Sequence, residues 1–124
     1  MRILAIDDQL LVLLPLQKKL EEAGYIVNVS TDASEGIGIY NRFQPDLVIV
    51  DINMPDMSGI DFIKHIRIKK GSSTPIIVLS GNTDDYVISE CFKYGVNDYM
   101  KKPLSLIEIE KRIKRLNIFF ETHS

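Results

Sequence analysis

Short apolar runs alternate with helix-like segments along the chain, and this alternation limits the possible folds more than any other feature of the sequence. Strands are predicted at residues 2–6, 25–29, 46–50, 76–79 and 97–101. Helices are predicted at residues 10–23, 33–43, 60–69, 84–93 and 105–120. Because the connections are short, the strands should pair in parallel through right-handed crossovers. We therefore expect an α/β fold, a three-layer sandwich around a doubly wound parallel sheet.

The length of the chain removes one class of parallel α/β fold. With 124 residues, the chain is too short for a closed eight-stranded barrel. Of the two common doubly wound sheets, we expect the flavodoxin-like one, with five (βα) units and strand order 2-1-3-4-5. That order places the topological switch point, where open α/β sheets bind ligands, between the first and third strands.

Charged residues stand where strands of this sheet should end. Asp7 and Asp8 follow the first apolar run, Asp51 follows the third, and Lys102 lies farther on, directly before Pro103. Parallel strands bring their carboxyl ends to one edge of the sheet. We therefore expect these three acids and Lys102 to converge.

Three neighbouring carboxylates repel one another, so either one of them stays protonated or cations neutralise the group. Two like charges about 4 Å apart repel by roughly 4 kcal/mol at an effective dielectric constant of about 20. Lys102 would supply one positive charge and a divalent cation two more, and all-oxygen ligands favour Mg²⁺, or Mn²⁺, over Zn²⁺. A phosphoryl group beside Asp51 would suit such an ion. Alternatively, the acids are exposed strand ends that cap helices, as Asp8 could for the helix beginning at residue 10.

Composition narrows the class of protein. A hydrophobic content of 45% can fill one core, so we expect a single domain over residues 1–124. The net charge of -2 gives no reason to expect direct nucleic-acid binding. The one cysteine, Cys91, cannot form a disulfide within the chain, and no apolar run is long enough to cross a membrane. These features predict a cytoplasmic domain without membrane contacts.

Four motifs, in this order, resemble those of a response-regulator receiver domain, the module of two-component and phosphorelay signalling. They are Asp7-Asp8, Asp51-Ile-Asn53-Met54-Pro55-Asp-Met57-Ser-Gly59, Ser80-Gly81 and Tyr99-Met-Lys-Lys102-Pro103. Each motif falls at the end of the strand where the family carries it, and the resemblance covers essentially the whole chain.

The resemblance implies a phosphoacceptor and a metal site. Asp51 would be the nucleophile that takes a phosphoryl group from a phosphohistidine. Asp8 and Asp51 would bind Mg²⁺ directly, and Asp7 would act partly through water. Asn53 would contribute its backbone carbonyl, which leaves its side chain free to vary.

The resemblance also assigns residues that contact the phosphoryl group and transmit its presence. Ser80 would donate a hydrogen bond to one phosphoryl oxygen, and Lys102 would pair with another. The family places its active lysine directly before proline, which selects Lys102 over Lys101 and implies a cis bond to Pro103. Ser80 and Tyr99 would form the switch, in which the ring turns inward as the hydroxyl moves toward the phosphoryl group.

Two surfaces should bind partners. The run from Leu10 to Leu14 wraps more than one helical face, so part of it should be exposed. In the family, this end of the first helix docks the sensor histidine kinase or histidine phosphotransfer protein. The fourth helix, fifth strand and fifth helix would contact a downstream protein or output domain. Ile107, Ile118 and Phe119 lie off the expected core stripe of the last helix.

Two other classes of function compete with the active receiver. One is a receiver-like module that binds partners without phosphorylation, although the chain retains every acid and the lysine. The other is a different enzyme on a similar fold, but no glycine-rich phosphate loop follows the first strand, which continues Asp7-Asp8-Gln9-Leu10. We expect a signalling switch that assists its own phosphorylation and dephosphorylation, not an enzyme in the usual sense. The sequence leaves open whether the chain stands alone or belongs to a larger regulator or hybrid kinase.

Overall fold

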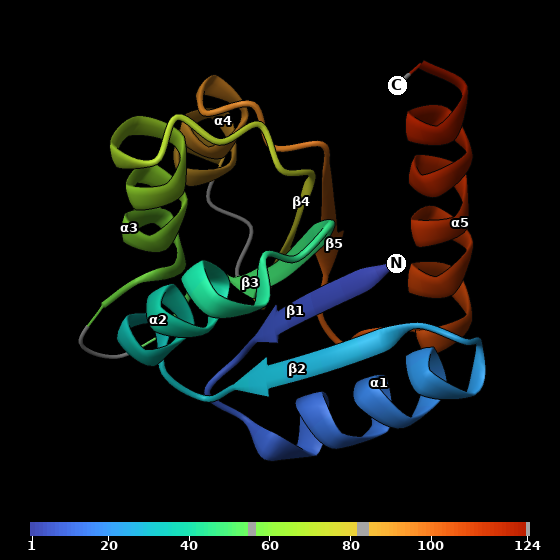
Figure 1. Ribbon diagram of the computed structural model, residues 1–124. Helices are drawn as coiled ribbons and strands as arrows, with labels where there is room; N and C mark the ends of the chain where they lie inside the picture. The colour runs from blue at the N-terminus through green and yellow to red at the C-terminus, as the bar shows by residue number, and fades with distance from the viewer. Residues whose placement is uncertain (55–56, 82–84, 124) are drawn as a thin grey trace.

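Five parallel strands form one sheet in the order β2-β1-β3-β4-β5 (Figure 1). The alternation of strands and helices predicted the parallel pairing. The computed structural model describes residues 1–54, 57–81 and 85–123, with side chains described up to residue 117. The strands are β1 (Arg2–Ile6), β2 (Ile26–Ser30), β3 (Leu47–Asp51), β4 (Ile76–Ser80) and β5 (Asp98–Lys101). The helices are α1 (Leu10–Glu22), α2 (Ala33–Phe43), α3 (Gly59–Lys64), η1 (His65–Lys69), α4 (Asp85–Lys93) and α5 (Leu106–His123). The flavodoxin-like strand order is confirmed.

The helices cover both faces of the sheet, which gives the predicted three layers (Figure 1). Along β1, Ile3 and Ala5 pack into the core layer shared with α1 and α5, while Leu4 and Ile6 pack into the layer on the side of α2, α3 and α4. Successive strand side chains point to opposite faces, and all four of these residues are fully buried. A strand that is buried on both faces reads as a continuous apolar run, which is why the central strands could be recognised in the sequence.

The third helical segment differs from the single α-helix expected over residues 60–69. An α-helix ends at Lys64 and continues as a π-helix, His65–Lys69, in which the backbone N–H of Lys70 donates to the carbonyl oxygen of His65 at 3.3 Å. Ile63 and Ile66 are both buried, so the apolar pattern is the same for one helix or for two joined segments. The wider turn was therefore not visible in the pattern.

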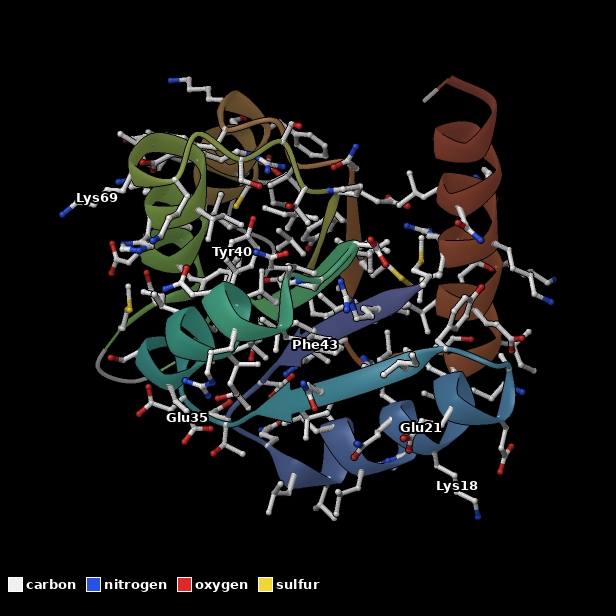
Figure 2. All side chains as sticks on the ribbon, in the orientation of Figure 1. Lys18, Glu21, Glu35, Tyr40, Phe43 and Lys69 are labelled. Carbon is white, nitrogen blue, oxygen red and sulfur yellow. The ribbon has the colours of Figure 1, made fainter. Side chains whose placement is uncertain are left out.

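Helix α1 continues through Pro15 and buries one apolar stripe, formed by Leu13, Leu16 and Leu20. A proline inside a helix removes one backbone hydrogen bond, but Pro15 does not end α1. Figure 2 shows Lys18 on the outer side of this helix, pointing away from the sheet. None of the helices in the described ranges is long and apolar enough to span a bilayer.

Some sequence predictions fall outside the described residues. The expected start of the fourth helix at Asp84 is one of them, and α4 is described from Asp85. The side chains of Ile118 and Phe119 are also outside the description. Ile107, in contrast, is 64% exposed, as expected for a residue off the core stripe of α5.

Candidate acidic site at the carboxyl edge of the sheet

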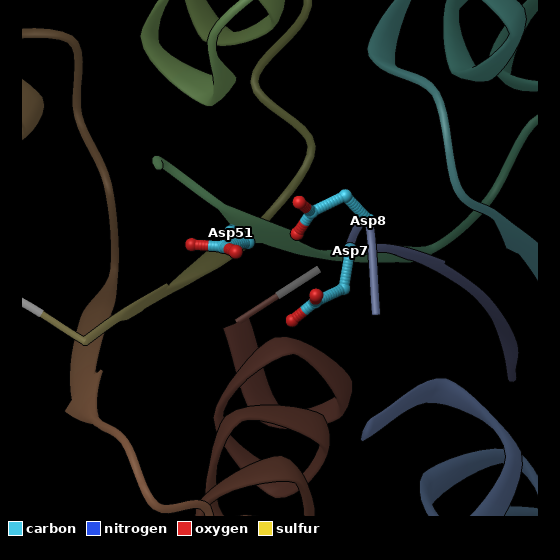
Figure 3. Close-up of side chains that lie close together, drawn as sticks. All are labelled: Asp7, Asp8 and Asp51. Carbon is cyan, nitrogen blue, oxygen red and sulfur yellow. The ribbon is translucent and has the colours of Figure 1, made fainter. Parts of the chain in front are cut away.

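The parallel register of the two central strands places their terminal acids side by side. Ile6 of β1 pairs with Val50 of β3, so the next residues, Asp7 and Asp51, leave neighbouring strands at the same level. Asp8 follows at once. One oxygen from each of the three carboxylates lies within 4.8 Å of the others (Figure 3). The predicted convergence of the three acids is therefore present in the structure.

Two of the three acids are buried. Asp7 has no exposed surface and Asp51 is 2% exposed, whereas Asp8 is exposed to solvent. The idea that Asp8 caps the first helix is wrong, because Gln9 occupies the N-cap position of α1 and no side chain caps it. The site thus combines two buried carboxylates with one that faces solvent.

Lys102 neutralises part of this negative charge. Its Nζ lies 2.7 Å from Oδ2 of Asp7 and 3.0 Å from Oδ2 of Asp51. A buried carboxylate without a partner would be costly, so a cation that contacts both acids accounts for their burial. Lys102 is the lysine that the sequence favoured, and the peptide bond between Lys102 and Pro103 is cis, as expected.

The side chains of Lys101 and Lys102 point in different directions because the two residues are adjacent in an extended segment. Lys101 is the last residue of β5, and its side chain is exposed. The backbone N–H of Lys102 donates to the carbonyl oxygen of Ser80 at 2.8 Å, which keeps the chain beside β4 for one residue more. Strand alternation turns neighbouring side chains to opposite faces. As a result, only Lys102 reaches the acids among these two lysines.

Burial and charge shift the pKa values of this pair in defined directions. Burial raises the pKa of Asp7, its contacts with Lys102 and with the Gln9 N–H oppose that rise, and the charge of Asp51 adds to it. For Lys102, burial alone would lower the pKa, but the contacts with Asp7 and Asp51 outweigh burial and raise it. Lys102 therefore keeps its positive charge at neutral pH, where the acids require it.

Ser80 and Asn53 complete the polar floor of the site. Ser80, the last residue of β4, is fully buried. The side-chain amide of Asn53 donates from Nδ2 to Ser80 Oγ at 3.2 Å, and the Asn53 backbone N–H donates to Asp51 Oδ1 at 3.0 Å. The sequence assigned only a backbone role to Asn53, so this side-chain contact is an addition from the structure.

Tyr99 lies on β5, partly buried against the core layer on the α3 side of the sheet. Its hydroxyl oxygen is buried and has no hydrogen-bond partner among the residues that the structure describes. β5 pairs with β4, with Tyr99 opposite Val78 and Lys101 opposite Ser80. Tyr99 is thus two residues out of register with Ser80, and its role in a switch stays a prediction.

Two residues of the site were not singled out by the sequence. A Cβ atom at Gly59 would lie 2.2 Å from the carbonyl oxygen of Asp51, so only glycine lets the start of α3 approach the end of β3 this closely. Gln9 donates its backbone N–H to Asp7 Oδ1 at 2.9 Å, and its side-chain oxygen accepts from Lys102 Nζ at 3.5 Å. The role of Gly59 could have been predicted because it is the only glycine in the motif that follows Asp51. No feature of the sequence indicated the contacts of Gln9.

An apolar groove of about 590 Å³ opens beside Lys102. It lies between the first half of α1 and the segment that joins β5 to α5. Its lining residues are Gln9, Leu11, Val12, Pro15, Gly81, Lys102, Pro103, Leu104 and Leu106. Leu10, Leu11 and Leu14 are 52%, 91% and 54% exposed, which confirms that part of the leucine run faces solvent.

The donor set determines what this arrangement can bind. Every side-chain ligand that the three acids offer is a carboxylate oxygen, the type that hard cations such as Mg²⁺ and Mn²⁺ prefer. One of the acids faces solvent, so an ion could keep several of its waters, as Mg²⁺ usually does. The residues present therefore fit a magnesium-type ion beside a buried carboxylate.

Comparison with known proteins gives a consistent result. Residues 3–114 match the family model of the response regulator receiver domain. The two-component response regulator PhoP of Pseudomonas aeruginosa is 35% identical over 94% of this chain and 51% of its own length. The cell cycle transcriptional regulator CtrA of Caulobacter vibrioides is 34% identical over 91% of this chain and 48% of its own. This chain thus spans about half the length of these curated relatives.

Solved structures agree with the sequence matches. The receiver domain of the Francisella response regulator 1452 is 31% identical, with a TM-score of 0.84 over 99% of this chain and 98% of its own. The chemotaxis protein CheY4 of Vibrio cholerae is 29% identical, with a TM-score of 0.85 over 92% of this chain and 96% of its own. A CheY-like receiver domain protein from Methanospirillum hungatei has a TM-score of 0.93 over 99% and 98%, and at 24% identity it supports the fold alone.

Proposed function

Because this chain belongs to the response regulator receiver domain family, we propose that it is a phosphorylation-controlled switch whose phosphoacceptor is Asp51. The observation that supports this most is the placement of Asp51, a buried carboxylate 3.0 Å from Lys102 and within 4.8 Å of two further acids. A carboxylate can accept a phosphoryl group as a nucleophile. A cation and fixed hydrogen-bond donors beside it stabilise the negative charge of the transition state.

The proposed reaction moves one phosphoryl group. A side-chain oxygen of Asp51 forms a bond to phosphorus, the bond between phosphorus and the imidazole nitrogen of a phosphohistidine breaks, and the imidazole keeps the electron pair. The reaction consists mainly of positioning and charge stabilisation. Asn53 N–H holds Asp51 Oδ1, and Lys102 holds Asp51 Oδ2, so the acceptor is fixed before a donor arrives.

Mg²⁺, or Mn²⁺ in its place, would be held by Asp7, Asp8 and Asp51 with the backbone carbonyl of Asn53. When bound, such an ion offsets the negative charge that gathers between the carboxylates and a phosphoryl group. Lys102 would pair with one phosphoryl oxygen. It already contacts Asp51, so it lies within reach of a group bonded to that carboxylate.

Ser80 and Tyr99 would transmit the phosphorylation signal from the site to the surface. Ser80 would donate to a phosphoryl oxygen, and Tyr99 would shift with it, which changes the population of two surface arrangements. Arg112 of α5 donates from Nη1 to the carbonyl oxygen of Tyr99 and to Asp98 Oδ1, both at 2.9 Å. These contacts join α5 to β5 beside Tyr99 and support the α4–β5–α5 face as the surface that a downstream protein or output domain reads.

Receiver domains of two-component systems interact with histidine kinases and with output domains. For this chain, we propose that a sensor histidine kinase or histidine phosphotransfer protein docks on the groove and on the exposed Leu10, Leu11 and Leu14. The groove is lined by Lys102 as well as by apolar side chains. A donor helix seated there would bring its phosphohistidine close to Asp51.

The test is the mass of the intact protein after incubation with acetyl phosphate or phosphoramidate, with and without Mg²⁺. Wild type should gain one phosphoryl group only with Mg²⁺, and Asp51→Asn should gain none. If Asp51→Asn were still labelled, the acceptor would be another residue. If wild type gained nothing from small donors or from a phosphohistidine protein, and bound no beryllofluoride, the chain would instead be a binding module that works without phosphorylation.

A further inference from the structure

The side chain of Asn53 makes a contact that the roles above leave unused. Its Nδ2 donates to Ser80 Oγ at 3.2 Å, while its backbone N–H donates to Asp51 Oδ1 at 3.0 Å. One residue of the β3–α3 loop therefore contacts both the proposed phosphoacceptor and the hydroxyl that would contact the phosphoryl group. The side chain therefore links the loop after β3 to the last residue of β4.

The direction of the Asn53–Ser80 hydrogen bond determines what the hydroxyl can do next. A serine hydroxyl has one proton to donate and lone pairs that accept. Because Ser80 accepts from the amide, its own proton must point away from Asn53. Phosphoryl oxygens only accept hydrogen bonds, so they require the hydroxyl in this donating orientation.

We propose that Asn53 is a positioning residue, which orients the Ser80 hydroxyl to donate to a phosphoryl group on Asp51. This inference rests on the proposed function. A donor that is already oriented needs no reorganisation when charge arrives, and this makes its contribution larger. Ser80 is fully buried, whereas Asn53 is exposed, so the amide can be changed without opening the core.

A double-mutant cycle with beryllofluoride as the probe of the phosphoryl position tests the proposal. The four proteins are wild type, Asn53→Ala, Ser80→Ala and the double variant, each titrated in saturating Mg²⁺ by calorimetry. In the presence of Ser80, Asn53→Ala should weaken beryllofluoride binding about three- to tenfold, the effect of one net hydrogen bond. In the Ser80→Ala background, the same substitution should change the affinity little, because no hydroxyl is left to orient.

The affinity for Mg²⁺ alone is the control, because Asn53→Ala keeps the backbone carbonyl. Any loss of Mg²⁺ affinity should be smaller than the loss of beryllofluoride affinity, and circular dichroism should show an unchanged fold. Equal losses of beryllofluoride affinity in both backgrounds, tighter binding by Asn53→Ala, or a matching loss of Mg²⁺ affinity would each overturn the positioning role. If wild type bound no beryllofluoride and also took no phosphoryl group from any donor, the proposed function would fail and this inference with it. Failure of the cycle alone would leave the proposed function intact.

Discussion

Lys102 Nζ lies 2.7 Å from Oδ2 of Asp7, a carboxylate with no exposed surface. The two residues lie near opposite ends of the sequence. They meet because β1 and β5 end at the same edge of one parallel sheet. The same ammonium group reaches Asp51. One lysine therefore holds two buried acids.

Replacing Lys102 by alanine should destabilise the metal-free protein by about 2 kcal/mol, because two buried carboxylates lose their cation. Added Mg²⁺ should restore part of the loss, since the acids remain to bind it. Urea unfolding with a chelator and with Mg²⁺ measures both effects. Lys101→Ala is the matched control, and an equal loss there would show that the contact with the acids is not the cause.

The two acids that follow β1 should differ in their effect on metal affinity. Asp8 faces solvent and Asp7 is tied to Lys102 and Gln9 N–H. Asp8→Ala should therefore weaken Mg²⁺ binding more than Asp7→Ala does. Titration followed by tyrosine fluorescence or calorimetry measures the two constants, and equal losses would contradict a direct role for Asp8 and an indirect one for Asp7.

Gly59→Ala should lower the free energy of unfolding by about 1–3 kcal/mol, because the added Cβ would overlap the Asp51 carbonyl oxygen and force the chain to shift. It should also displace Asp51 and reduce phosphorylation. Gly81→Ala is the control at the same edge of the sheet, since among the residues that the structure describes a Cβ there would meet only Lys102 Cδ, at 4.0 Å. Similar losses in the two variants would rule out the steric explanation.

Cys91 should make the protein less stable at alkaline pH. The thiol is 2% exposed, and burial, with the charge of Glu90, raises its pKa above the value of 9.0 that it has when unfolded. As the pH rises past 9.0, the unfolded chain loses this proton first, so stability should fall until the folded thiol also ionises. The measurement is the difference in unfolding free energy between wild type and Cys91→Ala at pH 8 and at a pH of about 10. A constant difference would contradict the raised pKa.

Leu11→Asp should slow phosphoryl transfer from a phosphohistidine protein about tenfold, because this leucine is 91% exposed and lines the groove beside Lys102. Phosphorylation by acetyl phosphate should be unaffected, since a small donor needs no docking surface. Ile107→Asp, an exposed apolar position on α5 outside the lining of the groove, is the control. Slower reaction with both donors would indicate damage to the site itself.

The sequence by itself determined the layers and placed the three acids at one edge of the sheet, while the strand order and the choice of Lys102 also drew on the family resemblance. Its information was local: apolar runs such as that before Asp51 are buried on both faces, and parallel strands must end together. Element bounds followed to within one or two residues, except at the end of α5 and at the π-helical turn from His65 to Lys69, where the apolar pattern is the same for either helix.

Only the tertiary structure decided which polar atoms touch. Burial of Asp7 but not of Asp8, the reach of Lys102 to two acids, and the hydrogen bond from Asn53 to Ser80 depend on how separate strands and loops pack. Gly59 is a further example, because a side chain at this position would overlap the carbonyl oxygen of Asp51, which lies at the end of a different element. The periodicity of a sequence indicates which face of a strand or helix a residue occupies. Contacts between polar atoms of separate strands and loops depend on how those segments pack, and the local sequence pattern does not contain that information.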